Sequence, residues 1–185
     1  IFDQDLAFMY DSLGNRIRAI ENGVTTEYTA NNMNQYVRVG ATNYVFDADG
    51  NLVQEITARG ATSLTYDDEN RLIAVTNQLG YWLYLYDAFG NRVATVQNDV
   101  TNRYIIDPTG LGNVVGEYDG FGKLVARYDH GLGLLSRTDA SGSAVYYTFD
   151  AIGSVQQLVT AGGAIATSYA YTPFGSVFSR MEALP

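Results

Sequence analysis

Two groups of residues in this sequence have side chains that could carry out chemistry, and the first surrounds His130. It is the single histidine of the 185 residues and directly follows Asp129. A histidine beside a carboxylate could act as a general base toward a serine nucleophile. The sequence has no Gly-x-Ser-x-Gly elbow to present such a serine. We therefore interpret His130 as a structural residue beside a turn, and we predict no catalytic residues and no enzymatic activity.

The second group is a set of acidic and amide side chains that could supply oxygen ligands to calcium. Asp47, Asp49 and Asn51 alternate along the chain. A helix–loop–helix calcium site needs glycine as the sixth residue of its loop, whereas Gly50 is the fourth residue here. The acidic run at 67–69 is typical of a charged turn tip in solvent. The sequence therefore predicts neither a metal site nor a bound cofactor.

The elements that position these residues are turns at a fixed spacing. Four tetrapeptides, DADG at 47–50, DDEN at 67–70, DAFG at 87–90 and DPTG at 107–110, begin twenty residues apart. Each begins with Asp, whose carboxylate can accept hydrogen bonds from backbone amides nearby, and ends in Gly or Asn, which tolerate a positive φ. This pattern predicts type I turns that close hairpins.

The same register continues toward both ends of the chain. Related tetrapeptides begin at positions 11, 31, 119, 139, 150 and 172, and weaker turn signals lie about halfway between most of these turns. An aromatic residue precedes most of the turns. We predict that the following residues are structural parts of the repeated turns: Tyr10, Asp11, Gly14, Phe46, Asp47, Gly50, Tyr66, Asp67, Asn70, Tyr86, Asp87, Gly90, Asp107, Gly110, Tyr118, Asp119, Gly122, Phe149, Asp150, Gly153, Tyr171 and Gly175.

A turn about every ten residues predicts short antiparallel strands. The segments between turns are rich in β-branched and aromatic residues, and 15 Tyr and 19 Gly suit strands and turns better than helices. We expect an all-β chain with little or no helix, built as a long antiparallel meander of sixteen or seventeen strands. Because long sheets twist, this meander should curl into a barrel, a spiral or a shell. The length would also be ample for a packed core.

Charge and composition restrict the partners of the chain. The net charge of −9 argues against binding to nucleic acid or to anionic membranes, because such binding needs clustered Lys and Arg. The absence of cysteine excludes disulfides and thiolate zinc sites. The first residue is not Met, and no signal peptide or membrane-spanning apolar run is apparent. We expect residues 1–185 to be a single segment of a larger protein.

The heptapeptides YDSLGNR at 10–16 and YDAFGNR at 86–92 closely resemble the YD-repeat, or Rhs (rearrangement hot spot), family. FDADGNL at 46–52 and YDDENRL at 66–72 are similar variants. The resemblance runs from Tyr10 to about Val177 and implies hairpins that spiral into a hollow shell. In bacterial members, including the C components of insecticidal toxin complexes, the shell encloses a toxic C-terminal domain. In the related teneurins of animals, it is an extracellular scaffold for adhesion.

The resemblance implies a secreted or cell-surface bacterial protein whose partners are the rest of the shell and an enclosed C-terminal domain. The repeats at 149–178 resemble the stretch before the closing core of such shells, which we expect beyond residue 185. That core self-cleaves at a string similar to DPTGL at 107–111, but Asp107 keeps the turn register, so we interpret it as a turn residue. The alternative function is an adhesion or carbohydrate-binding scaffold. The tyrosines could pack as cross-strand ladders or stack on sugars or on an unfolded polypeptide, and the two roles can coexist.

Overall fold

The computed structural model describes residues 5–109 and 112–182, and these residues form eighteen β-strands and no helix. Each strand pairs antiparallel with its neighbours in the chain, so the prediction of an all-β meander is confirmed. Gly110, predicted to end a turn, lies outside the described residues, as does Leu111. Within the described part of the chain, no helix is long and apolar enough to cross a membrane.

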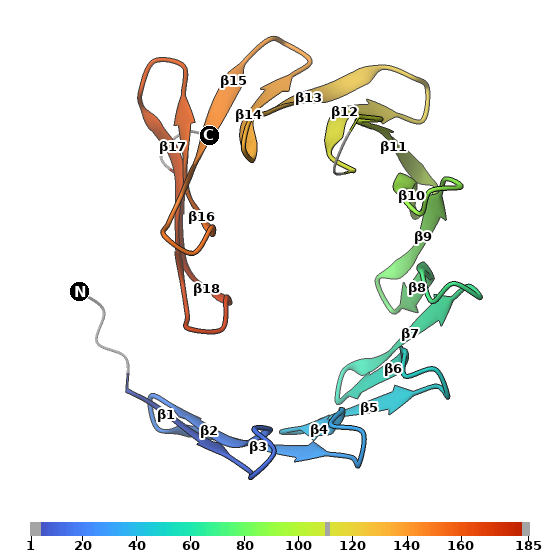
Figure 1. Cartoon of the computed structure of the whole chain (residues 1–185), viewed down its shortest axis with the longest axis vertical. Helices are drawn as coiled ribbons and strands as arrows, with labels where there is room; N and C mark the ends of the chain where they lie inside the picture. Colours follow the sequence, from blue (N-terminus) through green and yellow to red (C-terminus); the bar gives the residue numbers. More distant parts are fainter. Residues whose placement is uncertain (1–4, 110–111, 183–185) are drawn as a thin grey trace. The chain divides into compact units, whose positions relative to one another are not determined.

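The chain divides into two compact units, Ile1–Tyr84 and Leu85–Pro185. Within each unit the strands follow one another in chain order (Figure 1). Unit 1 contains β1 (Leu6–Tyr10), β2 (Arg16–Glu21), β3 (Val24–Ala30), β4 (Tyr36–Val39), β5 (Thr42–Phe46), β6 (Leu52–Thr57), β7 (Gly60–Tyr66) and β8 (Leu72–Asn77). The boundary falls in β9 (Gly80–Tyr86). Unit 2 contains β10 (Arg92–Gln97), β11 (Val100–Ile106), β12 (Val114–Asp119), β13 (Leu124–His130), β14 (Leu134–Asp139), β15 (Ala144–Phe149), β16 (Val155–Thr160), β17 (Ile165–Tyr171) and β18 (Val177–Glu182).

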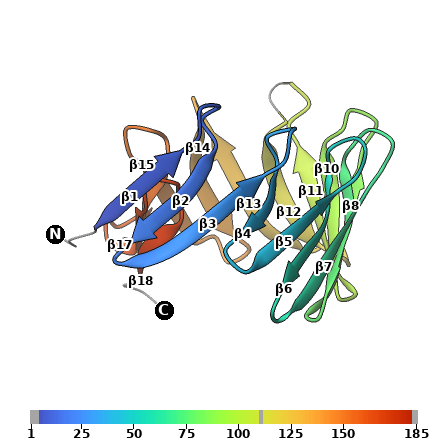
Figure 2. The same ribbon diagram turned by 90° about the horizontal axis from the view of Figure 1, so that it is seen from below.

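Two kinds of turn connect the strands, and in unit 1 they lie at opposite ends of the strands (Figure 2). Most strand pairs joined by a four-residue turn have a one-residue register shift beside the turn, as between Val45 and Phe46 in the pair β5–β6. The pair β14–β15, joined by the turn that opens with Asp139, has no such shift. The two-residue turns leave the register unbroken, as in β2–β3 and β6–β7. In the turn between β2 and β3, Asn22 and Gly23 both have positive φ, of 50° and 82°, which is the mirror-image turn that suits a tight hairpin.

Very few side chains are completely buried. Among the described residues, the buried hydrophobic side chains are those of Ala19 and Ala126, at 1% and 0% exposure. The length of the chain would allow a packed core, but each unit is a single sheet, and a single layer has no opposing layer to cover either face. Its stability therefore comes from backbone ladders and from side chains packed along the sheet, where a cross-strand pair contributes roughly 0.2–1 kcal/mol.

Candidate functional site: turn ladder and aromatic face

The side chain of the first residue caps each four-residue turn by accepting hydrogen bonds from backbone amides of the turn. In the turn from β5 to β6, Asp47 Oδ1 accepts hydrogen bonds from the amides of Asp49 and Asn51 at 3.0 and 2.8 Å, while the Gly50 amide donates to the Asp47 carbonyl. The carboxylates of Asp11, Asp67, Asp87, Asp119, Asp139 and Asp150 accept amides in the same way. The aspartate thus supplies both the first residue of the turn and its cap.

These hydrogen bonds lower the pKa of several turn carboxyls. The Asn15 side chain lowers the pKa of Asp11, and the Thr109 amide and hydroxyl lower that of Asp107. The hydrogen bond from the Ser141 hydroxyl is the largest cause that lowers the pKa of Asp139. Burial acts to raise the pKa of Asp47 and Asp67, but hydrogen bonds from the fifth residue of the turn and from other turn amides together outweigh it. All five carboxyls are therefore held below their usual pKa of 3.8, which means that the turns favour the ionised form.

In unit 1, side-chain amides connect each four-residue turn to the next one along the same edge. Asn15 Nδ2 donates to Asn34 Oδ1 at 3.0 Å, and Asn51 Nδ2 donates to Asn70 Oδ1 at 2.7 Å. Between these pairs, Gln35 Nε2 donates to the Gly50 carbonyl at 3.2 Å. We call this series of connected turns the turn ladder. Asn34 and Asn70 therefore have two roles, because they also adopt the positive φ, 59° in both, that the fourth position requires.

In unit 2, sequence reasoning missed one four-residue turn. Thr160 opens it, with its carbonyl accepting from the Gly163 amide at 2.9 Å and its hydroxyl accepting from the Ala164 amide at 3.2 Å. The sequence predicted only a weak turn at 161–163. The pattern at Thr172, whose hydroxyl accepts from the Ser176 amide at 3.1 Å, could have identified it, since both turns begin with Thr.

The predicted fourth-position residues that the structure describes lie at the ends of turns and have positive φ. The values are 85° for Gly14, 89° for Gly50, 59° for Asn70, 82° for Gly90, 83° for Gly122, 87° for Gly153 and 83° for Gly175. Five of the predicted aromatic residues end a strand, with the register shift beside them: Tyr10, Phe46, Tyr66, Phe149 and Tyr171. Tyr118 also lies beside a register shift, but it is the last residue but one of β12. Tyr86 ends β9, and Asp107 begins the turn after β11.

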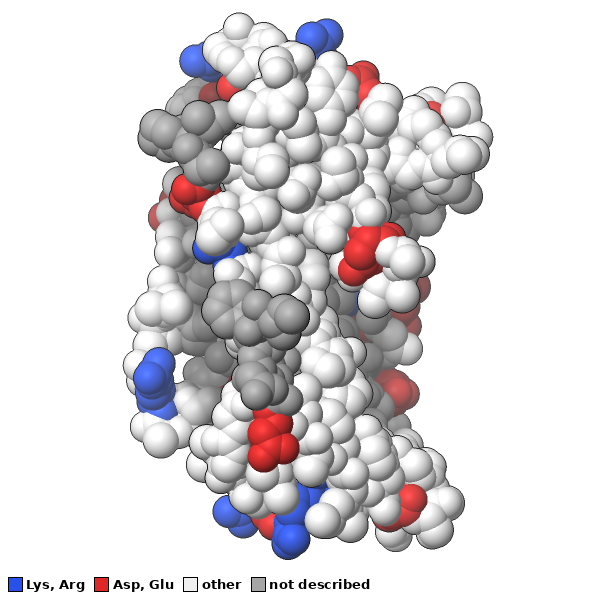
Figure 3. Space-filling view, turned by 90° about the vertical axis from the view of Figure 1, so that its left-hand side faces the viewer, with Lys and Arg blue, Asp and Glu red and all other residues white. Residues whose placement is uncertain are grey.

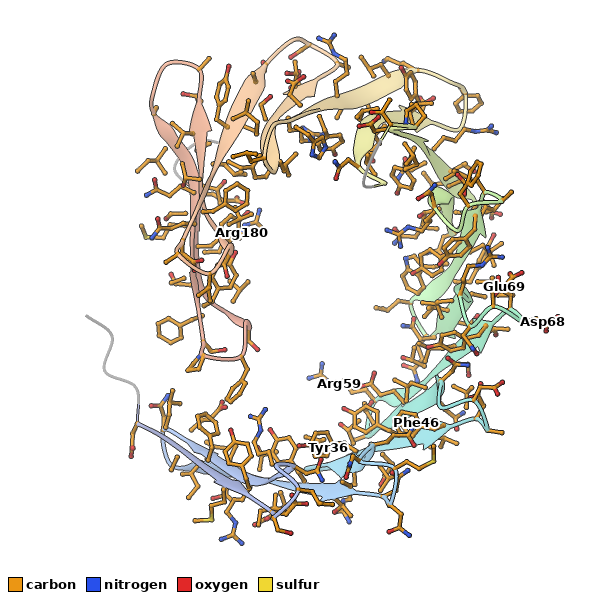
Figure 4. The ribbon with its side chains drawn as sticks, in the orientation of Figure 1. Tyr36, Phe46, Arg59, Asp68, Glu69 and Arg180 are labelled. Atoms are coloured by element: carbon orange, nitrogen blue, oxygen red, sulfur yellow. The ribbon has the colours of Figure 1, made fainter. Side chains whose placement is uncertain are left out.

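The aromatic side chains in unit 1 gather on one face. Tyr36 and Phe46 point to the concave side of the unit, and Asp68 and Glu69 point away from it (Figure 4). Tyr44 shares the face of Phe46 because side chains alternate along β5. Tyr28 meets Tyr36 edge-on at 5.4 Å, and the Arg16 guanidinium lies 4.9 Å from the centre of the Tyr28 ring. The Tyr36 hydroxyl accepts the Arg16 amide at 2.7 Å. These rings are packed and hydrogen-bonded within the sheet.

In unit 2, aromatic residues two positions apart on one strand stack beside the turn. Tyr147 and Phe149 lie 6.5 Å apart, and Tyr169 and Tyr171 lie 6.3 Å apart, each pair nearly parallel. The Arg180 guanidinium lies 6.0 Å from the Tyr169 ring, on the concave side of unit 2 (Figure 4). The Tyr171 hydroxyl donates to the Val155 carbonyl at 2.7 Å. The aromatic residue before a turn therefore also holds neighbouring strands together.

The residues that might form a catalytic triad are not arranged as one. Ser136 is 3% exposed and donates directly to Asp129 Oδ2 at 2.6 Å, and no histidine lies between them. His130 Nε2 lies 2.9 Å from the Val114 carbonyl instead. Neighbouring residues on a strand point to opposite faces, which separates His130 from the side chain of Asp129. This arrangement does not provide a general base for a serine.

The charged residues that the structure describes form no metal-binding cluster. Across residues 5–109 and 112–182, no three His, Asp or Glu side chains gather as metal ligands. The acidic residues predicted at 67–69 hold Arg71, which lies 2.7 Å from Asp67 and 2.6 Å from Glu69. On the face in Figure 3, blue and red side chains are scattered among uncharged ones.

Comparison with known proteins places this geometry in a family. The family model described as Teneurin YD-shell matches residues 3–181. A tRNA3(Ser)-specific nuclease WapA of Bacillus spizizenii is 32% identical over 181 residues, and a tRNA nuclease WapA of Bacillus subtilis is 29% identical over 179. Each alignment covers 92% of this chain but 8% of the relative, so the chain corresponds to a small part of those proteins.

Solved structures are similar in fold. The crystal structures of TcdB2-TccC3-Cdc42 and TcdB2-TccC3-TEV superpose with TM-scores of 0.53 and 0.52. Each match covers 96% of this chain and 11% of the other chain, at 12% sequence identity. At that identity, the likeness supports the shared sheet architecture.

Proposed function

Because the chain belongs to the teneurin YD-shell family, we propose that it is a non-enzymatic wall segment of a hollow β-shell that encloses a C-terminal toxin or effector domain. The observation that carries this proposal is the single-layered sheet of self-closing hairpins. Each four-residue turn supplies its own capping side chain, so the sheet can lengthen one hairpin at a time. A sheet that grows in this way is suited to a wall.

We place the enclosed domain and the closing core after the repeats at 149–178, in a longer secreted or cell-surface bacterial protein. The WapA relatives are named as tRNA nucleases, but this chain corresponds to 8% of their length. We assign no nuclease activity to this segment, because the net charge is −9 and His130 is engaged with a backbone carbonyl. The purified chain should leave tRNA intact, and cleavage that His130→Ala abolishes would contradict this assignment.

Limited proteolysis of the natural protein that contains this chain tests the enclosure. The C-terminal domain should resist protease while the wall is intact and become sensitive when Gly50→Val and Gly90→Val together weaken the wall. A matched Gly50→Asn and Gly90→Asn protein should remain protected, because Asn already occupies this turn position at Asn34 and Asn70. A domain cut equally fast in all three proteins would contradict enclosure.

A second candidate function, an adhesive or carbohydrate-binding scaffold, is favoured by the row of half-buried aromatic rings on the concave face of unit 1. Tyrosine rings can stack on sugars. Glycan binding by this chain alone, lost in Tyr44→Ala and retained in Val45→Ala on the opposite face, would support it. Equal binding by both variants would count against it.

A further inference from the structure

Two neighbouring turns of unit 1 enclose a small pocket. The turn at 58–59 connects β6 to β7, and the turn at 78–79 connects β8 to β9. Both turns lie at the same edge of the sheet, because successive strands run in opposite directions. The pocket has a volume of about 250 Å³, and its lining residues include Thr57, Arg59, Gly60, Thr62, Asn77 and Gln78.

The Gln78 side chain joins the two turns. It lies over Gly60, where a Cβ atom would come within 2.9 Å of Gln78 Cδ. Gly60 also has a φ of 134°, so both the backbone conformation and the side chain above it require glycine at this position. The Gln78 amide is therefore held beside the turn at 58–59, where it borders the pocket.

The pocket offers more hydrogen-bond donors than acceptors. Thr57 Oγ1 donates to the Gly60 carbonyl and accepts the Arg59 amide, both at 3.1 Å, so the hydroxyl is already engaged. Asn77 Oδ1 accepts a backbone amide of its own turn at 2.8 Å, which leaves the Nδ2 donors of Asn77. Within the described part of the chain, neither the Arg59 guanidinium nor the Gln78 amide has a hydrogen-bond or ion-pair partner. These donors can bind the oxygens of a ligand.

The Arg59 guanidinium indicates the charge of that ligand. It points to the concave side of unit 1 (Figure 4), and no acidic side chain is among the described residues that line the pocket. A guanidinium binds carboxylate or phosphate oxygens through two parallel hydrogen bonds. Phosphate groups are recognised by clusters of arginines, whereas this pocket has one, and the net charge of −9 disfavours a dianion. The pocket therefore suits a carboxylate.

The size of the pocket indicates what carries the carboxylate. Its volume lies below the roughly 300–1,000 Å³ of sites that hold a complete small molecule, so it suits one side chain of a larger partner. The apolar side chains of Ala61 and Leu79 also line it and can contact an aliphatic stem. Glutamate has such a stem, whereas a uronic acid carries its carboxylate directly on the sugar ring. We propose that this pocket binds the carboxylate of a glutamate side chain on a polypeptide that lies along the concave side of unit 1.

Nuclear magnetic resonance titration of this chain tests the proposal, with two blocked tripeptides as probes, one with glutamate and one with glutamine between two alanines. The glutamate peptide should shift the side-chain signals of Arg59 and Gln78, and the neutral glutamine peptide should not. Arg59→Gln should weaken binding of the glutamate peptide at least tenfold, because it removes the charged donor. Gln78→Ala should weaken binding less, because it removes a neutral donor.

Arg38→Gln is the matched control. It removes an exposed arginine near the same edge, whose guanidinium donates to the Gly40 carbonyl at 2.9 Å. This variant should bind the glutamate peptide like the wild type. Unchanged backbone amide signals away from the substituted residue would establish that all three variants fold.

Equal shifts with the two peptides, or undiminished binding by Arg59→Gln, would overturn carboxylate recognition at this pocket. Binding of galacturonate without binding of the glutamate peptide would overturn the polypeptide partner and identify an acidic sugar instead. The inference rests on the proposed shell, because the enclosed domain is the polypeptide, but the two fail separately. Peptide binding is measured on this chain alone, whereas protease protection is measured on the natural protein and does not depend on Arg59.

Discussion

Unit 1 and unit 2 build the same kind of sheet with different turns. In unit 1, four-residue turns lie at one edge and two-residue turns at the other, so register shifts occur at one edge. In unit 2, the turns β12–β13, β14–β15 and β16–β17 at the other edge are also four-residue turns. Register shifts occur beside β12–β13 and β16–β17 but not beside β14–β15, so both edges of unit 2 carry shifts. Since bulges bend a strand and increase its twist, unit 2 can bend at both edges.

The difference shows that two types of turn, which need different residues, connect the strands of these hairpins. Some two-residue turns have positive φ at both positions, as at Asn98 and Asp99, with φ of 46° and 70°. The turns at 58–59 and 78–79 have it at neither position, and the glycine after each, Gly60 or Gly80, has a φ of 134° or 129° instead. A four-residue turn needs one positive φ and an oxygen at its first position, a condition that Asp, Asn and Thr all meet. Because three residue types can cap the four-residue turn, the repeat can vary while the sheet continues.

The largest single-residue effect should come from the positive φ at the fourth turn position. Gly90→Val places a β-branched residue at φ 82° and should reduce the free energy of unfolding by about 1–3 kcal/mol. Gly90→Asn should have little effect, because Asn70 already adopts this conformation. Urea denaturation measures both, and equal stability of the Val and Asn variants would show that Gly90 does not need its positive φ.

Acid should destabilise the sheet, and unit 1 more than unit 2. The pKa values of Asp11, Asp47 and Asp67 in unit 1, and of Asp107 and Asp139 in unit 2, lie below 3.8 in the folded chain. Their contribution is complete above the unfolded pKa, and it is lost as the pH falls through the lower folded values. Hydrogen exchange at pH 6 and pH 3 should detect earlier opening in unit 1. In a chain with all five aspartates changed to Asn, the stability should change less between pH 6 and pH 3.

The identity of the first turn residue should produce a smaller difference between the units. Asp47 accepts two backbone amides, whereas Thr172 accepts the Ser176 amide. Asp47→Ala should therefore lower the melting temperature more than Thr172→Ala, because hydrogen bonds to a charged acceptor are stronger. Asp47→Asn, which keeps the acceptor oxygen, should be intermediate. The reverse order of the two Ala variants would contradict the capping role.

The turn ladder should give the smallest effect. In a double-mutant cycle of Asn51→Ala and Asn70→Gly, the coupling energy should be about 0.5–1 kcal/mol, the range of a neutral hydrogen bond. Gly at position 70 keeps the positive φ and removes the acceptor. A coupling near zero would mean that neighbouring turns are stabilised independently of one another.

Much of the fold could be predicted from the sequence, because the residue types that form and cap each turn lie next to one another in the chain. The Asp and Gly spacing predicted hairpins, and the eighteen strands follow it. The ladder could not be predicted, because the contact of Asn51 with Asn70 depends on which turns share an edge. The same limit applies to Ser136 and Asp129, which are seven residues apart but directly paired across two strands. The Thr160 turn was missed because it has neither Asp at its first position nor an aromatic residue before it, whereas Tyr171 precedes the predicted turn at Thr172.

Electron cryomicroscopy of the natural protein that contains this chain would test the central claim most directly. We predict a wall one sheet thick, with the aromatic face of these hairpins toward a cavity that holds another domain. A second sheet or a solid core packed against the aromatic face would contradict the proposed shell.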